Sequence, residues 1–475
     1  MSWETVIGLE VHTELATKSK IFCACTTAFG GSPNTHVCPV CSGMPGTLPR
    51  LNRQVVEFAI RTGLALDCDI TRYGKFDRKN YVYPDLPKAY QVSQLYAPIC
   101  QNGHLDIDAG GVPKTIAIRE IHMEEDAGKL IHDPLTGSTL VDYNRCGVPL
   151  LEIVSQPDFR SAAEVLAYLE KLRETLLFLE VSDCKMQEGS LRADVNLSVR
   201  RTGETALGTR TEMKNLNSFR AIGRAIAYEA ARQIDVLEEG GVITQETRRW
   251  DDDKGVSYSM RSKENAQDYR YFPEPDLLPL RVDDDWVERE RAALPELAHQ
   301  KRARYIADYG LSEKDAATLT GHKRVSDLFE ALADKTAAPR EAANLVTGEL
   351  MRLLNRTGTL PEDLSADSGT LARLITLVLD GKINRNAYKE AVEAVFTEDA
   401  DPDEYISAHG LLMLSDDGAV AEAVAAVVAD NPKSVADYRA GKQQALGFLM
   451  GQAMRRLGGK GNPAAVSQAL KERLN

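Results

Sequence analysis

Long apolar runs are missing from this chain of 475 residues. No apolar stretch approaches the roughly 20 residues that a helix needs to cross a bilayer, which argues against a membrane protein. The start, Met1-Ser2-Trp3-Glu4, shows neither a basic stretch before an apolar segment nor an Arg-rich, acid-poor leader. We therefore expect a cytoplasmic protein.

The common phosphate-binding loops are also missing. There is no Gly-x-x-x-x-Gly-Lys-Ser/Thr loop and no Gly-x-Gly-x-x-Gly turn, so a standard nucleotide-binding fold is not indicated. No Ser-rich or Cys-His arrangement marks an amidase. Positive charge is scarce, because 57 Lys and Arg stand against 70 Asp and Glu. That balance argues against sequence-blind nucleic-acid binding over the whole surface but leaves room for a local basic patch.

The composition changes along the chain, and its length predicts more than one domain. The first 293 residues alternate short strands with a few helices, of which the clearest run from Ser161 to Leu179 and from Ser218 into Leu237. The Pro-rich segment 272–279 is expected to interrupt any regular element. From about Leu294 onward, helical periodicity dominates.

Four of the eight cysteines fall within 19 residues: Cys23, Cys25, Cys38 and Cys41. Two closely spaced pairs joined by a loop can surround one tetrahedral ion, and four thiolates suit zinc. A closed set of four sulfurs leaves no position for water, so we interpret it as structural. The alternative is four small buried residues, and His36 is a substitute ligand or an ordinary loop residue.

Several predicted strands carry charged residues on one face. In the segment 6–14, Glu10, His12 and Glu14 alternate with apolar residues. Glu152 interrupts an apolar strand, where a lone carboxylate is costly unless it is paired or bound to a metal. The segment 119–129 is rich in oxygen ligands. This pattern favours a sheet whose polar face holds Mg²⁺, although such a face can also simply be solvated.

Basic and amide side chains lie on the faces of later predicted strands, where they would meet phosphate. They are Arg192, Asn196, Arg210 and Lys214. A further segment, 79–91, holds two prolines and three tyrosines and is typical of a rigid loop. Within it, Lys79 and Lys88 are candidates to reach phosphate, and Tyr81 is a candidate to stack on a base. Packing of the tyrosines against the domain is the alternative.

The end of the chain reverses its charge. Residues 399–430 carry no Lys or Arg, whereas residues 431–475 hold eight of them against Asp437 and Glu472. A helix is predicted from Lys442 to Leu457. The cations gathered around it are Lys442, Arg455, Arg456 and Lys460. They predict an anion site for RNA phosphate, and the alternative is a solvated helix end whose cations complement the helix dipole.

At these residues the sequence resembles the B-subunit family of tRNA-dependent amidotransferases. The resemblance covers essentially the whole chain. It includes residues 7–12, the four cysteines, residues 79–91, 122–129, 142–145, 147–157, 189–192, 214–220, 268–273 and 447–452. It differs at two positions, because many relatives have Val-Gln in place of Thr13-Glu14, and Gln187 stands where Glu is usual.

The resemblance implies an α+β fold. A cradle-like catalytic domain with a mainly antiparallel sheet (residues 1–293) would precede an all-α helical domain (294–407) and a small α-helical, tRNA-binding tail (408–475). It also implies a heterotrimer with an amidase A subunit and a small C subunit. ATP would phosphorylate the side-chain carboxylate of Glu-tRNA(Gln) or Asp-tRNA(Asn), and ammonia from the amidase would then give the amide.

The resemblance implies the metal ligands residue by residue, and the cationic and polar residues of the predicted strands and loop supply the other candidates. Mg²⁺ would be held by Glu10, His12, Glu125 and Glu152, with Glu124 as the alternative to Glu125 because neighbours on a strand face opposite ways. Arg192 and Lys214 would act in catalysis. Lys79, Tyr81, Lys88, Asn196 and Arg210 would bind nucleotide or substrate. Two other classes remain open: a non-catalytic tRNA scaffold, which the carboxylates oppose, and a zinc hydrolase, which the closed cysteine set opposes.

Overall fold

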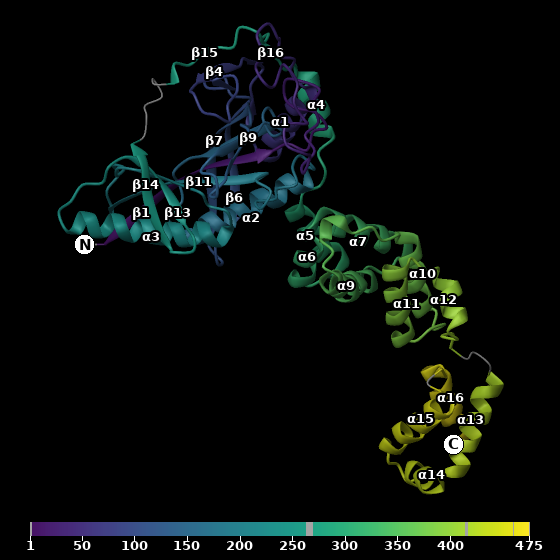
Figure 1. The fold of residues 1–475 in the computed structure, drawn as a ribbon. Coiled ribbons are helices and arrows are strands. Elements are labelled where there is room, and N and C mark those ends of the chain that lie inside the picture. Colours follow the sequence, from purple (N-terminus) through teal and green to yellow (C-terminus); the bar gives the residue numbers. More distant parts are fainter. Residues whose placement is uncertain (1, 263–268, 414–416, 459, 475) are drawn as a thin grey trace. The chain divides into compact units, whose positions relative to one another are not determined.

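The computed structural model describes residues 2–262, 269–413, 417–458 and 460–474 (Figure 1). The chain divides into two compact units, Met1–Leu297 and Ala298–Asn475. The first unit combines a mainly antiparallel sheet with helices, and the second is helical, which confirms the predicted α+β class. The finer division at residues 293 and 407 stays a prediction.

A nine-stranded sheet forms the centre of the first unit, in the order β14-β13-β12-β11-β1-β10-β7-β6-β2. The strands are β1 (Trp3–Glu14), β2 (Asp69–Ile70), β6 (Cys100–Asp108), β7 (Pro113–Glu125), β10 (Pro149–Ser155), β11 (Leu191–Arg201), β12 (Thr211–Lys214), β13 (Glu246–Asp251) and β14 (Val256–Ser262). Neighbours pair antiparallel, except that β12 and β13 are parallel. The predicted alternation in β1 is confirmed, because Ile7, Leu9 and Val11 are buried.

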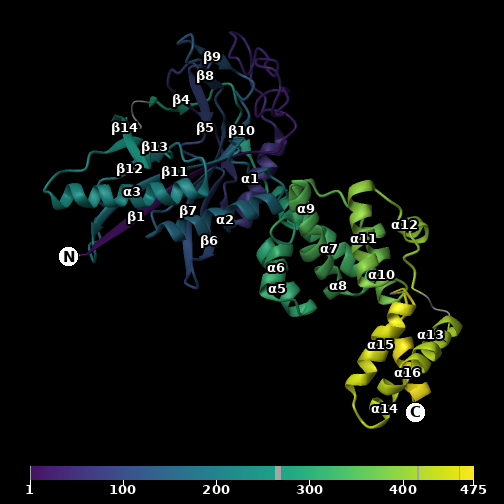
Figure 2. The same ribbon diagram turned by 60° about the horizontal axis from the view of Figure 1, so that its bottom comes forward.

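Helices cover the apolar face of this sheet and leave its polar face to the site (Figures 1 and 2). Both predicted helices are confirmed: α2 (Ala162–Phe178) is capped by Ser161 and α3 (Phe219–Glu238) by Ser218. Helix α1 (Arg53–Ala65), which Asn52 caps, was not predicted. The signal for it was present, because Val55, Val56 and Ala59 recur at helical spacing and are buried.

Smaller strands lie beside the main sheet. They are β3 (Tyr73–Gly74), β4 (Asp77–Asn80), β5 (Tyr90–Ser93), β8 (Lys129–His132), β9 (Thr139–Asp142), β15 (Phe272–Pro273) and β16 (Leu280–Arg281). Both ends of the predicted loop 79–91 are thus strands. The Pro-rich segment is not wholly irregular either, since Phe272 pairs with Arg78. Its proline is tolerated because β15 is an edge strand, and Glu274 accepts two hydrogen bonds from Arg78, at 2.7 and 2.8 Å.

A buried carboxylate fastens α3 to the sheet. Glu229 accepts hydrogen bonds from Thr211 Oγ1 at 2.8 Å, from Arg232 at 2.6 and 2.8 Å, and from Gln233 at 3.0 Å. Burial by itself would raise the pKa of Glu229, but these partners, Arg232 first, lower it overall. The carboxylate therefore stabilises the fold at neutral pH.

We expect Glu229→Gln to destabilise the protein by about 2–4 kcal/mol at pH 7, because it weakens a buried, hydrogen-bonded ion pair. Since the folded-state pKa of Glu229 is lowered, its contribution exists above the ordinary pKa of Glu and disappears as the pH falls through the lowered value. The difference in Tm between variant and wild type should therefore stay constant from pH 7 to about pH 5 and shrink as the pH falls below 4.5, the ordinary pKa of Glu. Asp235→Asn on the exposed side of α3 is the control, and an equal loss in that variant would contradict this role.

Helix α4 (Asp284–Ala292) is the last helix of the first unit. The α-helices of the second unit are α5 (Ala298–Tyr309), α6 (Glu313–Leu319), α7 (Lys323–Thr336), α8 (Pro339–Asn344), α9 (Met351–Thr357), α10 (Ser368–Leu379), α11 (Arg385–Glu398), α12 (Pro402–Ala408), α13 (Asp417–Asp430), α14 (Pro432–Arg439), α15 (Gln444–Arg456) and α16 (Pro463–Leu474). Residues 305–406 supply one apolar core and residues 420–474 another. Among the described residues, no helix is long and apolar enough to span a membrane.

Candidate functional site

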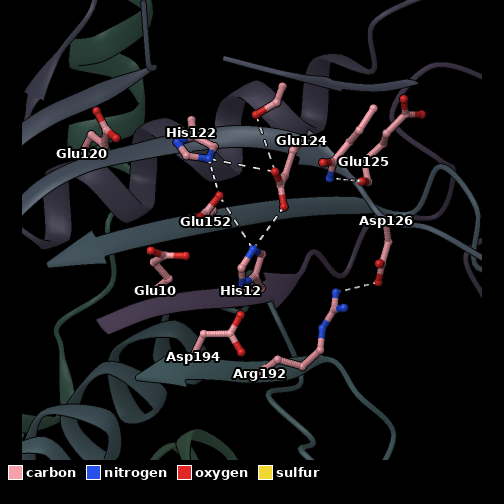
Figure 3. Close-up of polar contacts among 12 residues, drawn as sticks. Glu10, His12, Glu120, His122, Glu124, Glu125, Asp126, Glu152, Arg192 and Asp194 are labelled. Atoms are coloured by element: carbon pink, nitrogen blue, oxygen red, sulfur yellow. Dashed lines mark hydrogen bonds and ion pairs between the residues drawn. The ribbon is translucent and has the colours of Figure 1, made fainter. Parts of the chain in front are cut away.

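Three neighbouring strands bring a histidine and two carboxylates together on the polar face, and we call this set the first cluster (Figure 3). It comprises His12 on β1, Glu124 on β7 and Glu152 on β10. The Nε2 atom of His12 lies 3.4 Å from a Glu124 oxygen and 3.7 Å from a Glu152 oxygen. The strand register brings these side chains together. His12 stands opposite Glu152 on the neighbouring strand, and Glu152 in turn stands opposite His122.

Neighbouring charges and burial shift the pKa values of the residues in and beside the first cluster. His122 Nε2 lies 2.5 Å from a Glu152 oxygen. Burial would lower the pKa of His122, but Glu152 raises it to about 9. Burial would raise the pKa of Glu152, yet His122, His12 and the ammonium of Lys79 lower it overall. Burial, with the charge of Glu152, raises the pKa of Glu124. Two carboxylates packed this closely favour a proton on one of them or a cation between them.

Glu125 lies away from this cluster. Its carboxylate accepts hydrogen bonds from Lys88 Nζ and, at 2.9 Å, from the backbone N–H of Val92. The structure thus brings together the alternative residue, Glu124, with His12 and Glu152. The sequence held a signal for this result: Glu125 has the same strand parity as the apolar Ile121 and Met123.

A second set of carboxylates, the second cluster, lies on the same face. It consists of Glu10, Asp194 and Glu212, on β1, β11 and β12. Lys214 Nζ lies 2.5 Å from an Asp194 oxygen and 3.4 Å from a Glu212 oxygen, and Asn196 donates to Glu10 at 2.9 Å. Burial would lower the pKa of Lys214, but Asp194 and Glu212 raise it. The sequence had suggested Glu10 as a partner of His12, and neither Asp194 nor Glu212 was predicted as a ligand.

Arg192 stands opposite His12 in the register of β1 and β11. It donates to Asp126 at 2.7 Å (Figure 3), and Arg145 lies 3.4 Å from the same carboxylate. Arg192 and Arg145 thus share the carboxylate of Asp126. Burial, then the Asp126 carboxylate, raises the pKa of Glu14.

A cavity of about 470 Å³ borders the second cluster. Its lining includes Glu10, Arg119, Asn196, Ser198 and Arg210. The nucleotide-binding candidates Asn196 and Arg210 therefore share one cavity. Lys88 instead lines a smaller cavity of about 230 Å³ beside Cys23 and Cys41, so the structure separates it from those two.

The remaining nucleotide-binding candidates, Lys79 and Tyr81, lie in a group of aromatic side chains. Lys79 Nζ lies 5.6 Å from the ring centroid of Tyr81 and 5.1 Å from that of Tyr269. Asn80 donates to the Arg270 carbonyl at 2.8 Å and so ties the two segments together. Burial, followed by the Glu124 carboxylate, raises the pKa of Tyr81. Lys79 also pairs with Gln91, which donates to the Glu125 carbonyl at 2.8 Å, so this group lies near the strand that carries Glu124.

The four cysteines converge as the spacing predicts. One ligand atom from each lies within 4.8 Å of the others, and Cys38 N–H donates to Cys41 Sγ at 3.3 Å. A hydrogen bond from Cys23, then the Cys38 N–H and the Lys20 cation, lowers the pKa of Cys41 to about 4 against the effect of burial. Lys20 Nζ, which is buried, lies 3.6 Å from Cys41 Sγ. This set fits one soft, tetrahedral ion.

The four tail cations are exposed. Lys442 pairs with Asp437 at 2.8 Å and Arg456 with Asp430 at 2.9 Å. Such surface pairs contribute little, so both cations stay available to an anion. Helix α15 confirms the helix predicted in this part of the chain, and Arg455 and Arg456 occupy its last turn.

Comparison with known proteins connects both units to one family. Residues 5–288 match the GatB/GatE catalytic domain, and residues 327–474 match the GatB domain. The chain is 58% identical over 473 residues to the B subunit of the aspartyl/glutamyl-tRNA(Asn/Gln) amidotransferase of Lachnoclostridium phytofermentans, covering 100% of this chain and 99% of that protein. It is 56% identical to the protein of the same name from Caldicellulosiruptor bescii over 477 residues, with the same coverage. The chain therefore belongs to the family of B subunits of tRNA-dependent amidotransferases.

Proposed function

We propose that this chain uses ATP to activate the side-chain carboxylate of Glu-tRNA(Gln), Asp-tRNA(Asn) or both, and then converts it to the amide. One observation carries the proposal: two sets of buried and half-buried ligands, mostly carboxylates, share a polar sheet face beside a cavity. That arrangement suits phosphoryl transfer, which depends on positioning and on compensation of charge.

The first cluster (His12, Glu124, Glu152) and the second cluster (Glu10, Asp194, Glu212) would each hold Mg²⁺. Their oxygen-rich donor sets fit a hard cation, and the cationic partners His122 and Lys214 already offset part of their charge. When bound, Mg²⁺ would offset negative charge on the transferring phosphoryl group. Lys214 would remain beside Asp194 and contact phosphate oxygens.

ATP would occupy the cavity beside the second cluster. Asn196, Ser198 and Ser155 offer hydrogen-bonding groups there, and Arg119 and Arg210 offer positive charge. A side-chain carboxylate oxygen of the aminoacyl group would attack the γ-phosphorus atom, and ADP would leave. The product is an acyl phosphate attached to the tRNA.

Ammonia would complete the reaction. A partner amidase subunit would release it from glutamine, and a small third subunit would complete the heterotrimer. The ammonia nitrogen would attack the acyl carbon, phosphate would leave, and the nitrogen would lose one proton to give the amide. Exclusion of water matters at this step, because water would hydrolyse the acyl phosphate.

The test is amide formation by the purified heterotrimer on each misacylated tRNA. With ATP and glutamine, one ADP and one phosphate should form for each amide. Ammonium chloride should replace glutamine when the amidase is inactivated. Amide formation without ATP hydrolysis would refute the proposal.

The cysteine set predicts about one zinc per chain, measurable by elemental analysis. Cys41→Ser should lose this zinc and lower Tm, because the ion cross-links the Cys23–Cys25 and Cys38–Cys41 segments and its binding free energy adds to the free energy of folding. Cys68→Ser, at a buried cysteine outside the set, is the control and should retain zinc. A folded wild-type chain without zinc would rule the site out.

The tail predicts a contribution to tRNA binding. Removing residues 414–475 is a suitable truncation, because Met413 N–H still bonds to the Lys382 carbonyl at 2.7 Å and would hold the new end in place. We expect a KM for misacylated tRNA that is about tenfold higher and less dependent on salt, because fewer phosphates are neutralised. Glutaminase activity should persist. The same salt dependence in truncated and full-length enzymes would exclude this role.

A further inference from the structure

Four tyrosines from two distant segments form a connected group next to the first cluster. We call Tyr81, Tyr83, Tyr269 and Tyr271 the tyrosine group. Neighbouring rings meet edge to face, with centroids 6.0 Å apart for Tyr81 and Tyr83, 6.0 Å for Tyr81 and Tyr269, and 6.2 Å for Tyr269 and Tyr271. The order along the group is therefore 83, 81, 269, 271.

The tyrosine group extends from the first cluster to the surface. Lys79, which packs against two of these rings, pairs with Gln91 across β4 and β5, and Gln91 donates to the backbone carbonyl of Glu125 at 2.8 Å, next to Glu124. The charge of Glu124 acts on both Tyr81 and Tyr271. At the other end, the side chain of Tyr83 is 47% exposed and that of its neighbour Val82 is 80% exposed. An aromatic surface thus reaches from solvent to the carboxylates that would hold a metal.

Positive charge accompanies these rings. The Lys79 ammonium packs against Tyr81 and Tyr269 and also acts on Glu124 and Glu152. Arg270 is exposed beside them and has a left-handed backbone (φ 45°), which Asn80 helps to hold by donating to the carbonyls of Tyr269 and Arg270. Aromatic rings interleaved with cations are the usual features of a site for single-stranded nucleic acid.

We propose that the tyrosine group binds the 3′-terminal nucleoside of the aminoacylated tRNA, with its base stacked on Tyr83. The esterified amino acid would then extend along Lys79 towards the first cluster, and Arg270 would meet the terminal phosphate. This inference rests on the proposed function and adds the site for the acceptor end.

The placement also separates the two nucleosides that the reaction requires. The cavity for ATP borders Glu10 of the second cluster and its hydrogen-bond partner Asn196, whereas the tyrosine group lies beside the strand that carries Glu124 of the first. The γ-phosphate and the acceptor carboxylate would meet between the clusters. A single-stranded end is a suitable ligand, because its unpaired base exposes a face for stacking.

The experiment uses the heterotrimer and two probes, adenosine that carries glutamate through a 3′-amide and the same compound without adenine. Tyr83→Leu should raise the inhibition constant of the adenosine probe about 5- to 100-fold, the range that loss of one stacked base gives. Tyr83→Phe, which keeps the ring, should bind like wild type. The probe without adenine should bind wild type and both variants equally, and the KM for ATP should not change.

Tyr73→Leu is the matched control, because Tyr73 is 59% exposed and also packs against a cation, Arg281, at 5.9 Å. Unchanged probe binding by Tyr83→Leu, or an equal loss in Tyr73→Leu, would overturn the stacking assignment. These outcomes are separable from failure of the proposed function. In that case the wild-type heterotrimer itself would form no amide with ATP.

Discussion

Glu124→Gln is expected to lower the kcat of amide formation by about 10²–10³-fold, the usual cost of removing one strong electrostatic contact from a transition state. Glutamine keeps the shape of the side chain but removes the charge that faces His12 and Glu152. Steady-state rates at saturating ATP and misacylated tRNA would measure the effect, while the glutaminase activity of the partner amidase serves as a test of assembly.

Glu57→Gln provides the control, because Glu57 lies on α1, pairs with Arg53 at 2.9 Å and belongs to neither cluster and neither cavity lining. Its rate should stay close to that of wild type. Binding of Mn²⁺, followed by its paramagnetic resonance signal, gives a second measurement. If Glu124→Gln bound Mn²⁺ normally and Glu125→Gln did not, the ligand would be Glu125 and the first cluster would be assigned wrongly.

Asp194→Asn is expected to lower kcat about 10²-fold and to raise the Mg²⁺ concentration needed for half-maximal rate by about tenfold or more. Asp194 belongs to the second cluster and is the nearest carboxylate to Lys214. The substitution would remove a charged oxygen ligand from the second cluster. It would also break the ion pair that holds the Lys214 ammonium. A Mg²⁺ titration of the amidation rate at fixed ATP would separate the two effects.

High Mg²⁺ should restore part of the Asp194→Asn rate if the carboxylate binds the ion. Lys214→Met tests the other role, since it should lower kcat without changing the Mg²⁺ requirement. An Asp194→Asn enzyme with the wild-type Mg²⁺ profile would show that the second cluster does not hold a catalytic cation.

Local patterns in the sequence determined much of this fold. Alternation in residues 6–14 placed Ile7, Leu9 and Val11 on a buried face, because successive strand residues point to opposite sides. Ser161 and Ser218 marked helix starts, because their side chains satisfy the first free N–H groups. The cysteine spacing predicted a convergent set, because a short spacing limits how far two thiols can separate.

Only the tertiary structure decided which of these residues meet. Strand register brought His12 opposite Glu152 and put Glu124, not Glu125, in the first cluster. Long-range pairing placed Asp194 and Glu212 beside Glu10, and joined Tyr269 to Tyr81 across 188 residues of sequence. Residue periodicity is a local property of the chain and determines the face on which a side chain lies. The partner across the sheet depends instead on the packing of the whole unit, which chooses among registers that the local pattern leaves equally open.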